Sequence, residues 1–201
     1  MSASVSTNTA TTPALKEWGA IAAALLDGRQ TLLLRKGGIH EKRFEVSPPG
    51  TEQRAGQGFV LFPTVAHSHA ERVRPEHTGV LEVGARDVRD EVFTVRCGLT
   101  LVEVIEVRRP EGLAAIEDLH IWTAESVRTD RLEFRPRHPL RAMVVRAFEL
   151  PEPFILRRRP EYGGCRSWLD LPVAWDGCTG RQVQTEERLA GDAARVRSAF
   201  A

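Results

Sequence analysis

The longest strand-like run, residues 91–109, constrains the fold most. It reads EVFTVRCGLTLVEVIEVRR, and apolar residues such as Phe93 and Val95 alternate with polar or charged ones. A period of two is typical of a β-strand that buries one face. The run therefore predicts one long strand, or two strands joined near Gly98, ending before Pro110.

Shorter patterns predict the other elements. Residues 14–28 carry apolar side chains at helical spacing and predict a helix that ends at Gly28, with Trp18 as its packing anchor. Further strands are predicted at Gln30–Leu34, at 58–70 with Pro63 near a strand end or edge, and at 138–153 between Pro139 and Pro151. Further helices are predicted at 111–127 and 185–201.

This order of elements favours an α+β fold with a mixed, mostly antiparallel sheet and flanking helices, because regular strand–helix alternation is missing. We expect residues 1–13, rich in Ser, Thr and Ala, to form a disordered tail. We expect residues 14–184 to form a single domain and residues 185–201 to close it as a C-terminal helix. The segment 157–182 is the one region that suggests an excursion from the main fold.

Composition narrows the class of protein. The 201 residues include 28 Lys and Arg and 27 Asp and Glu, for a net charge of +1, so any attraction to a polyanion must come from local clustering. Three cysteines without a CxxC spacing argue against a disulfide framework and a cysteine zinc site. The N-terminus has no apolar segment of a signal peptide, and no run approaches the ~20 apolar residues of a membrane span. We therefore expect a cytoplasmic protein without a membrane partner.

The segment TLLLRKGGIHE, residues 31–41, is the first candidate site. An apolar strand ends at Arg35 and Lys36 and is followed by Gly37 and Gly38. Backbone N–H groups at a glycine turn can point together at an anion, and the two cations would add charge. The alternative is an ordinary turn in which the glycines adopt positive φ.

Arginines and aromatic residues are interleaved between residues 122 and 168. Guanidinium groups match phosphate geometry, and aromatic rings can stack on bases. The alternative is a surface of salt-bridged arginines above core aromatics. From this region the candidate phosphate contacts are Arg131, Arg146 and Arg166, and the candidate stacking residues are Tyr162 and Trp168; Trp122, Phe134 and Phe148 are interleaved as well.

A metal site is an alternative hypothesis. His67 and His69 are spaced to share one face of a strand, and Glu41 or His40 is the candidate third ligand of a divalent cation. The alternative is that these histidines are exposed or hydrogen-bonded and bind no metal. Cys165 is a weaker candidate for a nucleophile, because no histidine can be assigned to it. No GxSxG, HExxH or paired CxxC motif occurs, and no lysine follows the carboxylates of 82–109 as a PD-(D/E)xK nuclease requires.

Four segments together resemble a bacterial family, the domain of unknown function 1802. They are LKEWGAIAAALLDGRQTLLLRKGGIHE, FVLFPTVAHS, HPLRAMVVRAFELPEP and RPEYGGCRSW, and the resemblance runs from about Leu15 to about Leu171. The family has no assigned catalytic residues to carry over. Its association with restriction–modification domains implies a role near nucleic acid.

A looser likeness is to small β-barrels of the PUA/ASCH type, in which a helix ending at a glycine turn leads to a basic strand. The corresponding residues are Leu25–Gln30 and then Leu34, Arg35 and Lys36. This likeness implies a PUA-like barrel that binds RNA or a nucleobase-like ligand. Two departures from that pattern are the glycine pair after Lys36 and the extra chain after residue 157.

The leading hypothesis is a domain that binds nucleic acid or a nucleotide-like anion without a cofactor. The first alternative is a metal-assisted nuclease or other hydrolase that uses Glu41, His67 and His69. The second is a non-catalytic protein that docks on a partner through an exposed apolar patch. The oligomeric state is left open.

Overall fold

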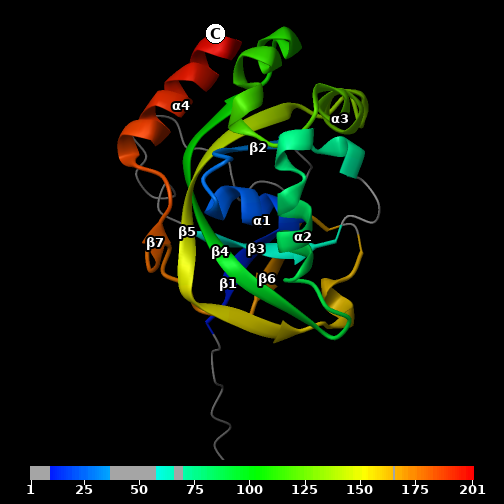
Figure 1. The fold of residues 1–201 in the computed structure, drawn as a ribbon, viewed down its shortest axis with the longest axis vertical. Coiled ribbons are helices and arrows are strands. Elements are labelled where there is room, and N and C mark those ends of the chain that lie inside the picture. Colours follow the sequence, from blue (N-terminus) through cyan, green and yellow to red (C-terminus); the bar gives the residue numbers. More distant parts are fainter. Residues whose placement is uncertain (1–9, 37–57, 66–69, 165) are drawn as a thin grey trace, which may run out of the picture.

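The computed structural model describes residues 10–36, 58–65, 70–164 and 166–201 (Figure 1). The strands in these ranges are β1 (Thr12–Trp18), β2 (Leu32–Lys36), β3 (Phe59–Thr64), β4 (Val92–Glu106), β5 (Leu140–Arg157), β6 (Trp168–Leu171) and β7 (Arg181–Gln182). The α-helices are α1 (Gly19–Leu26), α2 (Gly79–Ala85), α3 (Ala124–Val127) and α4 (Glu186–Phe200). Short 3₁₀ helices are η2 (Ala70–Arg72), η3 (Pro75–His77), η4 (Pro110–Leu119) and η6 (Pro160–Tyr162), and η5 (Arg128–Glu133) is a π-helix.

The strands form one mixed sheet in the order β2-β5-β4-β3-β1-β6, with β7 added on β5. Only β1 and β3 run parallel among the described pairs, and the other pairs are antiparallel. The long strands β4 and β5 curve around α1, so the sheet is a curled half-barrel (Figure 1). The predicted α+β class with a mostly antiparallel sheet is confirmed.

The two faces of β1 and β3 are both buried. Phe59 and Leu61 of β3 point into a large core that includes α1, β2 and α4, whereas Val60 and Phe62 point into a second core with Phe93. A strand covered on both faces has no polar side to alternate with. This explains why FVLF reads as an uninterrupted apolar run. Pro63 lies one residue before the end of β3, as predicted.

The predicted helix at 14–28 is wrong in its first half. Thr12–Trp18 is strand β1, which pairs with β3 on one side and β6 on the other, and α1 begins only at Gly19. The expected tail 1–13 thus overlaps β1, and its first nine residues lie outside the described part. Sheet pairing far along the chain outweighed the local helical spacing.

Gly19 marks the true start of the helix for a packing reason. A Cβ atom at Gly19 would lie 2.3 Å from the carbonyl oxygen of Gly84, so the backbones of α1 and α2 touch at this point. Such close approach is open only to glycine.

Two other elements have boundaries that differ from the prediction. The helix predicted at 111–127 is two helices, η4 and α3, separated by an extended segment in which Trp122 bridges to Val73. Strand β5 runs past Pro151 to Arg157, because the partners of Val95 and Cys97 skip from Phe154 to Glu149 and leave the prolines out of the ladder. The strand predicted at 91–109 and the helix predicted at 185–201 are found as β4 and α4.

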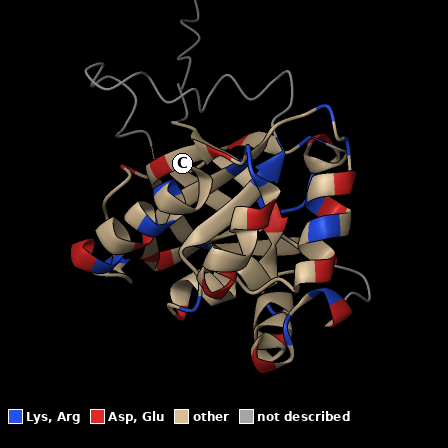
Figure 2. Cartoon of the chain, turned by 90° about the horizontal axis from the view of Figure 1, so that it is seen from above, with Lys and Arg blue, Asp and Glu red and all other residues tan. Residues whose placement is uncertain are grey.

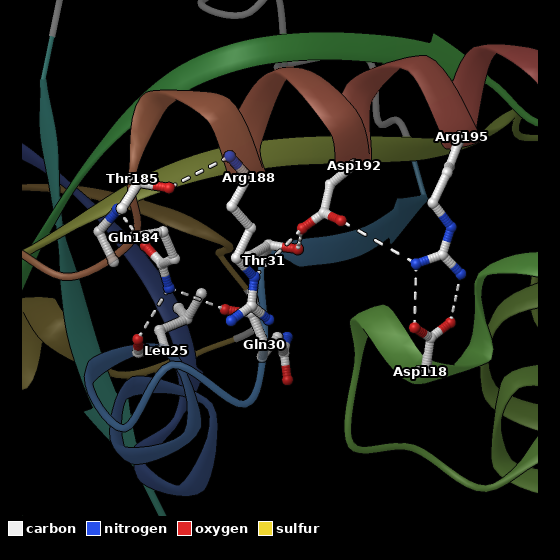
Figure 3. Close-up of polar contacts among 10 residues, drawn as sticks. Leu25, Gln30, Thr31, Asp118, Gln184, Thr185, Arg188, Asp192 and Arg195 are labelled. Atoms are coloured by element: carbon white, nitrogen blue, oxygen red, sulfur yellow. Dashed lines mark hydrogen bonds and ion pairs between the residues drawn. The ribbon is translucent and has the colours of Figure 1, made fainter.

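Helix α4 is anchored by side chains from distant parts of the chain (Figure 3). Thr185 caps it by accepting a hydrogen bond from the Arg188 N–H at 3.2 Å. The buried Asp192 accepts a 2.8 Å bond from the Thr31 hydroxyl. Arg195 makes a bidentate pair with Asp118 of η4, at 3.0 and 2.6 Å. These contacts position α4 against the core.

Among the described residues, no helix has both the length and the apolar character to cross a lipid bilayer.

Candidate functional site

Arg35 lies at the end of β2 and is partly neutralised by Glu17 of β1. Its guanidinium donates a 3.0 Å hydrogen bond to Glu17 Oε2, although β1 and β2 are not neighbours in the sheet. Only 7% of the Glu17 side chain and 18% of the Arg35 side chain are exposed. The other Glu17 oxygen accepts the N–H of Trp18 at 3.0 Å. The pair therefore joins the two sides of the half-barrel at this end, and Arg35 already has a carboxylate partner.

Lys36 uses its three donors within the chain. Its ammonium donates to the carbonyl oxygens of Leu132, Arg135 and His138, at 3.3, 3.3 and 3.0 Å. Burial lowers the pKa of Lys36. Because an ammonium has three hydrogens, Lys36 is committed to shaping the loop at 132–138, and its positive charge is what it adds to the surface.

Arg131 is a half-buried cation beside Arg35. Its Nε donates a 3.1 Å bond to the carbonyl of Leu34, and its guanidinium lies over the ring of Trp122 at 5.4 Å from the centroid. Trp122 in turn makes an edge contact with Trp18 at 4.9 Å. Burial lowers the pKa of Arg131, and the charge of Arg35 lowers it further, while Glu17 opposes this. The guanidinium nevertheless remains charged at neutral pH, since its ordinary pKa is far above 7.

Arg141 lies directly opposite Arg35 in the register of β5 and β2. Side chains that oppose each other across two strands share one face of the sheet, so two like charges meet here. Glu106, which opposes Arg141 from β4, binds Arg108 instead, at 3.3 Å. This arrangement concentrates positive charge at the end of β2.

We define the basic end as Arg35, Lys36, Arg131, Arg135, Arg137 and Arg141. Within the part of the chain that the structure describes, only Arg35 of these six has an ion pair with a carboxylate. Arg135 and Arg137 are exposed, and Arg131 and Arg141 are half-buried. Red and blue segments alternate along the helices in Figure 2, and η5, which carries Arg131, also carries Asp130 and Glu133. The basic end thus brings together Arg35, Lys36 and Arg131 of the predicted site.

Arg146 lies elsewhere and is paired. It is five residues along β5 from Arg141, roughly 17 Å at ~3.3 Å per residue. Its guanidinium forms a bidentate pair with Glu186 of α4, at 2.8 and 2.6 Å, and donates to the Thr100 hydroxyl at 3.3 Å. The structure therefore places Arg146 in the anchoring of α4 and away from the basic end.

The predicted stacking residues are packed against core side chains. Tyr162 is 8% exposed and packs edge-on against Phe62 and Phe93, with ring centroids 5.8 Å away in both cases. Trp168 is half-buried in β6 and makes an edge contact with Phe59 at 5.3 Å. Both are core aromatics, which is the alternative that the sequence left open.

A second double-glycine segment, Gly163-Gly164, is held by Lys16. Its ammonium donates to the carbonyl oxygens of Gly163 and Gly164 at 3.2 and 3.1 Å. Arg166 follows this segment and is exposed. Its neighbour in the chain, β6, lies at the opposite edge of the sheet from β2. The segment before β6 nevertheless runs beside β1, where the Lys16 N–H donates to the Ser167 carbonyl, and Glu17 of β1 contacts Arg35, so the curl of the sheet does not separate Arg166 from the basic end.

The remaining predicted site residues lie outside the described part of the chain. They are Gly37, Gly38, Glu41, His67 and His69, together with the candidate nucleophile Cys165. Among the residues that are described, no group of three or more His, Cys, Asp and Glu side chains is placed to hold a metal ion. The metal hypothesis therefore stays a prediction.

Phe134 is one of the interleaved aromatic residues, but it is not among the predicted stacking residues. Phe134 follows η5 and is 53% exposed, and the guanidinium of Arg135 lies 5.1 Å from its ring centroid. Arg135 has a φ of 48°, an uncommon conformation for a residue with a side chain. Nothing in the local pattern distinguishes this exposed phenylalanine from a core one, because exposure depends on the packing of the whole domain.

A family model described as "Domain of unknown function (DUF1802)" matches residues 14–195. The chain belongs to this family. The match covers most of β1 through most of α4, and so includes the whole basic end. No curated protein matches the chain.

Two solved structures from Zymomonas mobilis are similar to the DUF1802 chain. One is a mutant of an ASCH protein, with 12% identity, a TM-score of 0.41, and coverage of 80% of this chain and 89% of that one. The other is an ASCH protein with 10% identity, a TM-score of 0.41, and coverage of 94% and 96%. At these values neither likeness bears on function.

Proposed function

We propose that this DUF1802 protein binds nucleic acid or a nucleotide-like polyanion at the basic end. The observation that carries the proposal is that Arg131, Arg135, Arg137 and Arg141 gather there without an ion pair to any described carboxylate. Like charges held together repel one another, and a bound polyanion removes that repulsion while releasing its own counterions.

The chemistry of these side chains suits phosphate. A guanidinium presents a planar fork of donors that matches two phosphate oxygens, which an ammonium cannot do. Arg131 is partly desolvated beside Trp122, so its attraction to an anion is screened less than that of a fully exposed arginine. Lys36 contributes its charge and holds the loop that carries Arg135 and Arg137. An association with restriction–modification stays a prediction from the family resemblance.

The test measures binding of a fluorescently labelled single strand of about 12 nucleotides by anisotropy. The variant Arg137→Gln/Arg141→Gln removes two cations that have no carboxylate partner, so folding should be unaffected. We expect the affinity to fall about tenfold and the slope of log K against log salt to fall by roughly 1.4, since each phosphate contact contributes about 0.7.

The control is Arg157→Gln/Arg158→Gln, at the far end of β5. These two arginines are also exposed and also without an ion pair to a described carboxylate, and the change in net charge is the same. We expect this control to bind like wild type. Equal losses in the two double variants, or no binding by the wild type at about 50 mM salt, would refute the proposal. Cleavage of the strand that a chelator abolishes would support the hydrolase alternative instead.

A further inference from the structure

Phe134 is the one aromatic among the large apolar side chains that the described residues expose. The others, Val65, Val83 and Ile155, are aliphatic. Leaving more than half of a phenylalanine in water is unfavourable, because burying such a side chain is worth about 2 kcal/mol. This exposed ring, beside Arg135, is a feature that the proposed phosphate contacts of the basic end do not use.

The loop that presents the ring is held in place. The Lys36 ammonium binds the carbonyls of Arg135 and His138, and the His138 N–H donates back to Arg135 O at 2.9 Å. Pro136 restricts the backbone between them. A ring on an ordered loop loses little conformational freedom when a ligand covers it, so more of the contact energy remains for binding.

The surroundings of Phe134 point to the kind of ligand. Arg135 lies against the ring, and Arg137 follows two residues later. A flat aromatic surface flanked by phosphate-binding groups matches a nucleotide whose base face is free. In a duplex both faces of each base are covered by neighbouring bases, whereas a single strand offers them.

We infer that Phe134 is a stacking platform for an unpaired base, and that the ligand of the basic end is single-stranded nucleic acid. Arg135 extends the platform, and Lys36 positions it. The inference rests on the proposed function, and it adds a contact to the base where the arginines contact the backbone.

The experiment is a cycle of two proteins and two strands. The wild type and Phe134→Ala are each titrated with a labelled strand of about 12 nucleotides and with an abasic strand of the same length, which keeps the phosphates and lacks the bases. We expect Phe134→Ala to lose about tenfold in affinity for the ordinary strand, with an unchanged salt slope. On the abasic strand the two proteins should bind alike. Phe134→Trp should bind the ordinary strand at least as well as wild type.

A matched control removes an exposed apolar side chain elsewhere. Ile155→Ala, from a residue that is 71% exposed in β5, should leave both affinities unchanged. Equal binding of the two strands by the wild type would overturn the stacking role, and so would an equal loss on both strands in Phe134→Ala. Salt-dependent binding of the abasic strand would still uphold the proposed function in those cases. Absence of binding to either strand would defeat both.

Discussion

The arginines around α4 and those of the basic end are the same residue type in opposite electrostatic situations. Around α4, Arg146 binds Glu186, Arg195 binds Asp118 and Arg197 binds Glu103. At the basic end, Arg131, Arg135, Arg137 and Arg141 have no such partner among the described residues. The two groups cannot be told apart by counting charges, since the chain as a whole is nearly neutral.

The difference separates arginines that hold the fold from arginines that are free to bind. A bidentate pair between elements far apart in sequence fixes their relative position, as Arg195 and Asp118 do for α4 and η4 (Figure 3). Arg135, Arg137 and Arg141 make no side-chain hydrogen bond to a described residue and keep their donors for a ligand, whereas Arg131 already donates to the carbonyl oxygens of Leu34 and Asp130. Changes around α4 should therefore reduce stability, and changes at the basic end should reduce binding.

The largest expected effect concerns the buried His120, whose charged neighbours include Arg131 of the basic end and Asp118, the partner of Arg195. Its Nδ1 accepts the N–H of Trp122 at 3.2 Å, and it is 2% exposed. Burial, and then the charges of Arg74 and Arg131, lower its pKa to about 4 from an ordinary value of 6.5. Between these values the unfolded chain binds a proton that the folded chain does not, so the free energy of unfolding falls as the pH drops from 6.5 to 4.

The expected loss is on the order of 3 kcal/mol, measured by urea unfolding at a series of pH values. His120→Asn keeps an acceptor and does not titrate, so its stability should depend less on pH. Burial also lowers the pKa of His77, which adds a smaller change of the same sign to both proteins. An identical pH dependence in the two proteins would show that burial and the nearby cations do not lower the pKa of His120.

The next largest effect tests whether Asp192 anchors α4. Asp192→Ala removes the acceptor of the fully buried Thr31 hydroxyl and a carboxylate near Arg188. An orphaned buried hydroxyl should lower the free energy of unfolding by about 2 kcal/mol, measured by urea unfolding. Asp192→Asn keeps an oxygen for Thr31 and should lose about half as much. If both variants are as stable as wild type, α4 is not anchored by this contact.

The smallest effect concerns the arginines of the basic end. Arg141→Gln removes a cation that faces Arg35 across the sheet, so its free energy of unfolding should stay within about 0.5 kcal/mol of wild type or rise slightly. The difference should shrink at high salt, because screening already weakens the repulsion in the wild type. A clear loss of stability would place Arg141 with the structural arginines and weaken the proposed site.

Several elements were predictable because their signals are local. The alternation in β4, the apolar run of β3 and the spacing of α4 each reflect a face that the element buries. The strand β1 was not predictable in this way. Its residues fit a helix by spacing, and only the pairing with β3 and β6 makes them a strand.

The candidate site divides in the same manner. The sequence indicated that Arg35, Lys36 and Arg131 belong to a cationic region, and the structure brings them together. It also suggested Arg146, which pairs with Glu186, and Tyr162, which packs in the core. Phe134 had no signal in the sequence, since both exposed and buried phenylalanines occur in such patterns.

The amino-acid sequence by itself determined the kind of fold and the supply of cations, because residue spacing sets which faces can be buried and composition sets the charge. Only the tertiary structure decided which cations are neutralised. Arg195 meets Asp118 across 77 positions of chain and Arg35 meets Glu17 across 18, whereas Arg141, between Arg35 and Glu106 in the sheet, has no ion pair with a described carboxylate. Partners at such separations are chosen by the packing of strands and helices, and no local pattern encodes that choice.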